Sequence, residues 1–393
     1  MMPLFLLAAT ISANFEGGSL GRVEPVAAAH FRCAAKGEAD QDGRNRQANW
    51  YYFRVDGVAG QQVTIDLVDL VGEYNYRPGA LSVTKDTHPV YSYDQKTWKH
   101  FDTVEWDDRE IRLRLRFRAE RSPLWIAHVP PYTNRDLESL LAGFRSHPQL
   151  RREVSGKTAG GRDMLLLTIT NPAVPDAGKK VAWLMFRQHS WESGSSWAGD
   201  GAIRFLLSGD AAARRLRDEV IFKIFPMADP DGVARGGVRF NAHGYDLNRN
   251  WDAVDPQKMP EIAAQRQAVL DWVDAGHRLD LFLSLHNTET VEYLEGPPAP
   301  VVGRFYRALV DLTTFAPTGP ARVQEASTTP GKPGRMNVSQ GLFHDRRIPA
   351  MIMEQMICRN PKLGRFPTAE DRQQFGAGLA RAAGRAITVA GSE

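Results

Sequence analysis

The chain has 393 residues, a hydrophobic content of 42%, a charged content of 24% and a formal net charge of +3. Chains of this length usually divide into two domains, and this composition is that of an ordinary soluble protein. The small net charge gives no reason to expect nucleic-acid binding. Cys33 and Cys358 lie far apart and outside any CxxC motif, which excludes a disulfide framework and a thiolate zinc site. We expect two buried free thiols, with one long-range disulfide as the alternative.

The first residues, MMPLFLLAATISANFEGG, allow two interpretations. Residues 3–9 could be the apolar part of a signal peptide within residues 1–13, and the protein would then be exported. No Lys or Arg precedes this run and the run is short, which favours a first β-strand and a cytoplasmic protein. No apolar run approaches the ~18–20 residues that span a bilayer, so we expect no membrane insertion.

The first third of the sequence predicts β-structure. Residues 49–55 and 61–70 are rich in aromatic and β-branched side chains and are bordered by Gly- and Pro-containing turns. Residues 110–118 alternate strictly, with apolar side chains on one face and arginines on the other. The arginine face could bind an anion or an acidic partner, but a solvated face is the simpler interpretation. Short strands between turns indicate a β-sandwich domain over residues 1–129.

The pattern changes after two consecutive prolines, and we expect a second domain over residues 130–393. Thr133 or Asn134 can cap a helix that starts near Asp136. Apolar runs of strand length then alternate with helical spacing, which is clearest in residues 262–276. These runs predict an α/β fold with a mixed, mainly parallel sheet flanked by helices. The runs are residues 179–186, 219–227, 279–285 and 348–354.

Residues of metal-binding type follow or end three of these runs. His189 and Glu192 follow the first, His286 follows the third and Glu354 ends the fourth. In open α/β sheets, residues at the carboxyl ends of strands converge on one crevice. Two imidazoles and one carboxylate make an open zinc site of the catalytic type, and a carboxylate outside the metal could act as a base. Glu289 repeats the His-x-x-Glu spacing after His286, but a fourth ligand would close the site, so we interpret it as a bystander.

The order of the motifs resembles that of the M14 zinc carboxypeptidases, and in particular the cytosolic carboxypeptidase-like subfamily. Each motif is weak alone, and together they cover nearly the whole chain. The resemblance implies a β-sandwich domain followed by a catalytic domain that binds one Zn²⁺. The matching elements are PYTNRDL (131–137), His189 with Glu192, Asp231-Gly232, Arg239, DLNRNW (246–251), His286 and Glu354.

The resemblance also implies roles. His189, Glu192 and His286 are implied as zinc ligands. Glu354 is implied as the base that activates the zinc-bound water and later protonates the leaving amine. A salt-bridged structural role is the alternative for Glu354, because a buried unpaired carboxylate is costly.

Three further residues are implied to contact the substrate. Arg249, with Asn248 beside it, is implied to hold the terminal carboxylate, which a planar guanidinium fits with two parallel hydrogen bonds. Pairing of Arg249 with Asp246 or Asp252 is the alternative. Arg239 is implied to stabilise the oxyanion that develops on the scissile carbonyl.

The sequence departs from the subfamily pattern in three places. Ser190 and Trp191 replace the usual Pro-Gly inside the HxxE turn, and position 229 is Asp where Asn is common. No tyrosine occurs between Thr328 and Glu354 to match the family's active-site tyrosine. The missing tyrosine weakens the inference about the substrate more than the inference about the reaction.

The segment 328–347 precedes Glu354 and is rich in basic residues and glycine. A pocket that contains Arg335 would suit an acidic C-terminal residue such as Glu, by direct charge pairing. Exposed loop charges, Lys332 among them, are the alternative.

The favoured function is a zinc carboxypeptidase that acts on the C-terminal tail of a peptide or protein. An amidase or deacylase with a non-peptide substrate would keep the zinc chemistry but would not need the carboxylate clamp of Arg249 and Asn248. A non-catalytic binding module on this fold is the third possibility, and the intact ligand set argues against it. The sequence does not predict an oligomeric state.

Overall fold

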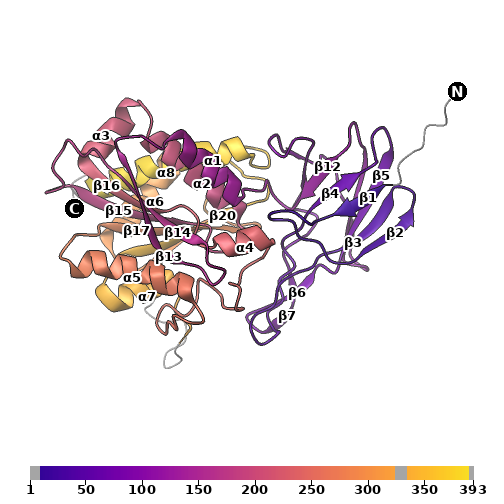
Figure 1. The fold of residues 1–393 in the computed structure, drawn as a ribbon, viewed down its shortest axis with the longest axis horizontal. Coiled ribbons are helices and arrows are strands. Elements are labelled where there is room, and N and C mark those ends of the chain that lie inside the picture. The colour runs from indigo at the N-terminus through magenta and orange to yellow at the C-terminus, as the bar shows by residue number, and fades with distance from the viewer. Residues whose placement is uncertain (1–8, 324–333, 389–393) are drawn as a thin grey trace. The chain divides into compact units, whose positions relative to one another are not determined.

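The computed structural model describes residues 9–323 and 334–388 (Figure 1). Contacts divide the chain into two units, each described separately below. One unit comprises the chain as far as Pro131 together with Gly232–Arg239, and the other comprises Tyr132–Asp231 and Phe240–Glu393. The domain limits that we expect from the sequence, 1–129 and 130–393, stay a prediction.

The first unit is a β-sandwich, as predicted. Its two five-stranded sheets have the orders β1-β4-β12-β8-β9 and β10-β11-β5-β3-β2. Buried side chains of both sheets form one core, to which the first sheet contributes Phe53 and Val55 and the second Ile65 and Leu115. The strands of the first sheet, in sheet order, are Thr10–Ser12, Tyr52–Asp56, Leu124–Ala127, Val90–Ser92 and Lys99–His100. Those of the second are Glu105–Asp107, Arg112–Arg118, Gln62–Val68, His30–Ala34 and Val23–Ala27, and β6 (Val71–Tyr74) and β7 (Arg77–Leu81) form a separate hairpin.

The arginine-bearing strand β11 is antiparallel to both of its neighbours, as predicted. The expectation of a solvated arginine face is wrong for two residues. Arg114 Nε donates to Oδ1 of the buried Asp66 at 2.5 Å, and Arg112 Nη1 lies 3.7 Å from Oδ2 of the same carboxylate. Burial tends to raise the pKa of Asp66, but the hydrogen bonds from Arg114 and His30 outweigh it and lower the pKa to about 2. These arginines therefore compensate a buried charge within the sandwich.

The expectations for the first strand and for the two cysteines can be compared with the structure. Thr10–Ser12 forms β1 and pairs with β4, which confirms the first strand over these residues, whereas residues 1–8 lie outside the described part. Both cysteines are free thiols; Cys33 is buried as expected, and Cys358 is only half-buried because it lies just beyond the end of β20. Within the described residues, no helix combines the length and apolar character that crossing a bilayer requires.

The second unit is built on an eight-stranded sheet with the order β13-β14-β16-β15-β17-β20-β18-β19. The central strands β16, β15, β17 and β20 run parallel, while β14 and β18 pair antiparallel with the strands beside this centre. This arrangement confirms the predicted mixed, mainly parallel sheet. In sheet order the strands are Leu150–Lys157, Asp163–Ile169, Val220–Phe225, Lys180–Phe186, Leu281–Thr288, Ala350–Met356, Tyr293–Gly296 and Arg322–Val323.

Helices cover both faces of this sheet (Figure 1). On one face α2 and α8 pack closely, because Gly201 and Gly376 lie where a Cβ atom would clash with the backbone of the other helix. On the other face α5 and α7 share a buried core with the sheet. The helices are α1 (Asn134–Gly143), α2 (Ser193–Leu206), α3 (Ala211–Glu219), α4 (Pro230–Arg235), α5 (Pro260–Asp274), α6 (Pro300–Leu312), α7 (Val338–Arg346) and α8 (Ala369–Thr388).

Two central strands extend further than the sequence predicts, and this positions two of the candidate residues. β17 continues to Thr288 and β20 to Met356, so that His286 and Glu354 lie inside the strands rather than at or beyond their ends. The two residues are register partners. The apolar runs end earlier than the strands because the backbone pairing between the two strands continues through polar residues.

Candidate metal centre

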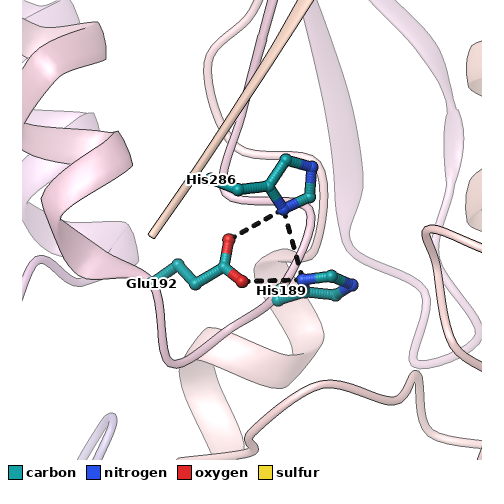
Figure 2. A group of neighbouring side chains, drawn as sticks. All are labelled: His189, Glu192 and His286. Atoms are coloured by element: carbon teal, nitrogen blue, oxygen red, sulfur yellow. Dashed lines mark hydrogen bonds and ion pairs between the residues drawn. The ribbon is translucent and has the colours of Figure 1, made fainter. Parts of the chain in front are cut away.

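The side chains of His189, Glu192 and His286 meet in one buried cluster (Figure 2). Nδ1 of His189 lies 2.7 Å from Oε1 of Glu192, and Nδ1 of His286 lies 2.9 Å from Oε2 of the same carboxylate. The two Nδ1 atoms are 3.3 Å apart. One potential ligand atom from each residue lies within 4.8 Å of the others, which is the spacing that a shared metal ion requires. Within the described part of the chain, Glu289 does not join this group.

The opposite nitrogen of each ring has a hydrogen-bond acceptor that fixes the tautomer. Nε2 of His189 lies 3.1 Å from the Asp246 carboxylate, which can only accept. Nε2 of His286 lies 3.1 Å from Oε1 of Gln188, whose amide orientation is set by donation from its Nε2 to the Leu247 carbonyl at 2.6 Å. Both rings therefore carry their proton on Nε2 and direct the Nδ1 lone pair into the cluster, as metal-binding histidines do.

The turn that presents His189 and Glu192 is supported from inside by a buried arginine. Arg187 is 1% exposed, and its Nε donates to the Ser190 carbonyl at 2.9 Å. Burial lowers the pKa of Arg187 to about 10, so the guanidinium stays charged at neutral pH. Trp191, in the middle of the turn, is buried. The Ser190-Trp191 pair that departs from the subfamily pattern is therefore part of the packed support of the cluster.

The charge of Glu192 is favoured by its surroundings. Burial would raise the pKa of this carboxyl, but the positive charges that His189 and His286 carry when protonated outweigh burial and hold the pKa well below its usual range. Glu192 also immediately precedes α2, and the N-terminus of a helix stabilises a negative charge. Two neutral imidazoles and one ionised carboxylate are the donor set of an open zinc site, so the residues present fit this metal.

Asp246 gives a test of the ring orientation. The Asp246→Asn variant is expected to bind Zn²⁺ about 10–100-fold more weakly, because the amide no longer fixes the tautomer and orientation of His189. Competition with a chromogenic chelator measures this affinity. Asp271→Asn, which makes the same change at an exposed position of α5, is the control and should leave the affinity unchanged. Equal zinc affinity in both variants would refute the role of Asp246.

Glu354 lies beside the cluster on the adjacent strand. It is half-buried, and register pairing puts it between His286 of β17 and Tyr293 of β18. Side chains of register partners project from the same face of a sheet. The predicted base Glu354 and the predicted ligand His286 thus share one face of the sheet, and Tyr293 lies on the same face.

Asn248 and Arg249 follow directly on Asp246. The backbone N–H of Asn248 donates to the Asp246 carboxylate at 2.9 Å, so the carboxylate that holds His189 also holds this segment. Arg249 is half-buried and donates from Nη1 to the Asn248 carbonyl at 2.8 Å. Among the described residues, Arg249 forms no ion pair, and the alternative of a salt bridge to Asp246 or Asp252 is wrong.

The local surroundings of the other two predicted residues, Arg239 and Arg335, are also described by the structure. Arg239 is nearly buried and belongs to the first unit, where its backbone N–H donates to Glu38 at 2.7 Å and its guanidinium carbon lies 5.6 Å from the centre of the Tyr74 ring. Arg335 is half-buried in the segment before α7. Its neighbours Gly334 and Met336 are hydrogen-bonded to Asn250 and Trp251, next to Arg249. Lys332, also named in the basic segment, lies outside the described residues.

Several residues around the cluster had no clear signal in the sequence. Gln188 follows the predicted strand and Ser284 lies inside one, and neither belongs to a motif, yet both contact Nε2 of His286. Tyr293 and Glu295 lie in the short strand β18, whose alternation of Tyr and Glu with Leu and Gly could have indicated a strand with one polar face.

The second unit is a mixed β-sheet flanked by helices, and it holds a buried His–Glu–His cluster beside a further carboxylate. This fold and this site define a metal-dependent hydrolase. Two family models match the chain. The model described as zinc carboxypeptidase, peptidase M14, matches residues 137–295, and that of the cytosolic carboxypeptidase N-terminal domain matches residues 11–128. The chain therefore belongs to the M14 zinc carboxypeptidases, a family of hydrolases, and carries the N-terminal domain of the cytosolic carboxypeptidases.

Individual relatives agree with this assignment. An uncharacterized protein of Zymomonas mobilis is 27% identical over 72% of this chain and 69% of its own length. Mouse cytosolic carboxypeptidase 6 is 29% identical over 72% of this chain and 54% of its own, and mouse cytosolic carboxypeptidase 3 is 27% identical over 65% and 27%. The chain thus spans about half or less of these two mouse proteins.

Solved structures share the fold over almost the whole chain. The metallo-carboxypeptidase from Burkholderia cenocepacia is 24% identical and has a TM-score of 0.82, with 96% of this chain and 99% of that chain covered. The metallo-carboxypeptidase from Pseudomonas aeruginosa is 22% identical and has a TM-score of 0.77, with 95% and 98% covered. At this level of identity the likeness shows the fold alone.

Proposed function

We propose that the protein is a zinc carboxypeptidase that removes the C-terminal residue from peptides or protein tails. The observation that carries this proposal is the position of Arg249, which forms no ion pair among the described residues and lies three residues after Asp246, the hydrogen-bond partner of the proposed ligand His189. A carboxylate-binding arginine beside a metal cluster distinguishes a peptidase of chain ends from an amidase acting on other amides.

His189, Glu192 and His286 would hold one Zn²⁺ per chain. When bound there, zinc supplies a Lewis acid that polarises the scissile carbonyl and acidifies a water molecule. The Glu354 carboxylate accepts the proton of the attacking water and transfers it to the leaving amine. In the proposed mechanism Arg239 stabilises the negative charge that develops on the carbonyl oxygen. Support for Glu354 comes from its register with His286; the role of Arg239 rests on the family resemblance.

Arg249 and Asn248 would hold the terminal carboxylate of the substrate. Asn248 uses its side-chain oxygen to accept from the Val338 N–H at 3.0 Å, which directs the amide and leaves its Nδ2 as a donor. A guanidinium beside this amide can donate two parallel hydrogen bonds to the carboxylate. The terminal residue is thereby fixed, and the peptide bond that precedes it faces the cluster.

The carboxylate contact gives a direct prediction. Arg249→Met is expected to lower kcat/KM about 10–100-fold for a peptide with a free C-terminus, because a charged hydrogen bond is lost. The residual activity on the same peptide with an amidated C-terminus should not change. Arg307→Met, which removes an exposed arginine of α6, is the control. Equal losses on the free and the amidated peptide would show that Arg249 does not bind the terminal carboxylate.

The preference for the C-terminal residue and the cellular location are further proposals. The preference for an acidic C-terminal residue rests on Arg335, because its neighbours Gly334 and Met336 pair with the backbone next to Arg249. A panel of peptides ending in Glu, Lys, Phe or Ala tests this preference.

A cytoplasmic location is supported by the names of the cytosolic carboxypeptidases among the relatives. Fractionation of the producing cells tests the location, and recovery in the exported fraction would favour a signal peptide.

A further inference from the structure

The peptide group between Leu247 and Asn248 is connected to one histidine of the cluster through Asp246. Its N–H, which belongs to Asn248, donates to Oδ1 of Asp246 at 2.9 Å, and the same oxygen lies 3.1 Å from Nε2 of His189. This nitrogen is on the side of the ring that faces away from Glu192 (Figure 2). The orientation of the peptide group is therefore tied to that of the His189 ring.

The same peptide group is connected to the second histidine through Gln188. Its carbonyl, which belongs to Leu247, accepts from Nε2 of the Gln188 amide at 2.6 Å, while Oε1 of that amide lies 3.1 Å from Nε2 of His286. A backbone carbonyl can only accept, so the amide nitrogen faces Leu247 and the amide oxygen faces the ring. Ser284 donates from its hydroxyl to this amide oxygen at 3.1 Å. Gln188 is completely buried, so bulk water does not compete for these hydrogen bonds.

The two side chains that orient the rings therefore hold opposite ends of one peptide group. A peptide group is planar, so its N–H and its carbonyl cannot turn independently of each other. The Leu247 carbonyl also accepts from Nε1 of the buried Trp251 at 3.0 Å, which connects it to the core. Asn248 and Arg249, the carboxylate clamp of the proposed function, begin at this peptide group. The positions of the rings and of the clamp are thus set by one hydrogen-bonded network.

We propose that Gln188 is a positioning residue that couples the metal cluster to the carboxylate clamp. This inference rests on the proposed function. Through its amide oxygen Gln188 holds His286 with Nδ1 directed into the cluster, and through its amide nitrogen it holds the peptide group at which the clamp begins. The terminal carboxylate and the scissile bond of a substrate are therefore kept at a fixed separation, which is what a reaction at the second bond from the clamp requires.

The test replaces Gln188 by methionine, which has a similar length and forms neither hydrogen bond. Zinc affinity, measured on the full chain by competition with a chelator, should fall about 10–100-fold. The second measurement is the ratio of kcat/KM for a peptide with a free C-terminus to that for the same peptide amidated, at saturating zinc. This ratio should fall about 10-fold, because a displaced clamp affects only the free peptide, whereas a displaced ring affects both peptides equally.

Gln265→Met is the matched control. Gln265 is also buried, and its Nε2 donates to a backbone carbonyl, that of Ala228, at 2.8 Å. Its second contact is with the sulfur of Met164, so it makes the same kind of buried hydrogen bond outside the network described above. The control should lower the melting temperature as Gln188→Met does, and it should leave the zinc affinity and the peptide ratio at their wild-type values.

The outcomes separate this inference from the proposed function. Wild-type zinc affinity in Gln188→Met, or an unchanged peptide ratio, would overturn the coupling while the carboxypeptidase activity stands. The same two losses in Gln265→Met would show a general effect of instability and would also overturn it. If zinc-loaded wild type cleaves neither peptide, the proposed function is wrong and the coupling falls with it. Should Gln188→Met fail to fold, Gln188→Ala, which reaches neither group, replaces it with the same expected losses.

Discussion

Replacing Glu354 by glutamine is expected to lower kcat/KM for a peptide substrate by about 10²–10⁴-fold while leaving the zinc content at the wild-type value. Glutamine has the size and shape of glutamate but cannot accept the proton of the attacking water at neutral pH. Glu354 lies beside His286 in the sheet and outside the His–Glu–His group. The loss should therefore be in the chemical step, and kcat should fall much more than KM rises.

Glu289→Gln is the matched control for this variant. Glu289 has the spacing of the second His-x-x-Glu copy and lies just beyond β17, and its replacement should leave both activity and zinc content unchanged. Wild-type activity in Glu354→Gln would exclude the proposed base. Loss of zinc from Glu354→Gln would instead identify Glu354 as a ligand.

Removal of one ligand has the second large expected effect. His286→Asn should reduce the zinc content of the purified protein from about one ion per chain to a small fraction, with loss of peptidase activity. Nδ1 of His286 is one of three donor atoms in the cluster, and two protein ligands bind zinc far more weakly than three. Metal analysis by mass spectrometry after dialysis against a weak chelator measures the content.

The melting temperature gives a second, independent measurement on the His286→Asn variant. A metal that binds only the folded state raises the melting temperature, so added Zn²⁺ should stabilise wild type and not His286→Asn. His243→Gln, at an exposed position, is the control and should respond to zinc as wild type does. A full zinc complement in His286→Asn would rule out His286 as a ligand.

The architecture could be predicted because its signals are local. Strict alternation in 110–118 and the apolar runs 179–186, 219–227, 279–285 and 348–354 each match a strand. The extents of β17 and β20 could not be predicted, because backbone pairing between the two strands carries them through His286 and Glu354 although the side chains turn polar. The pairing of Arg112 and Arg114 with Asp66 could not be predicted either, because it joins neighbouring strands that are far apart in sequence.

The candidate site could likewise be predicted only in part. His189, Glu192 and His286 could be named from motif order, and the structure places them in one group. Asp246, which orients His189, lies in a recognised motif, but Gln188 and Ser284 have no motif, and their contacts with His286 are visible only in the structure.

The release of a single residue from a free C-terminus tests the proposed function most directly. Zinc-loaded protein is incubated with one peptide in two forms, with a free and with an amidated C-terminus, and the products are identified by mass spectrometry. The free form is expected to lose its last residue and the amidated form to remain largely intact. Cleavage inside the chain, equal loss from both forms, or no cleavage by protein that contains its full zinc would contradict a carboxypeptidase.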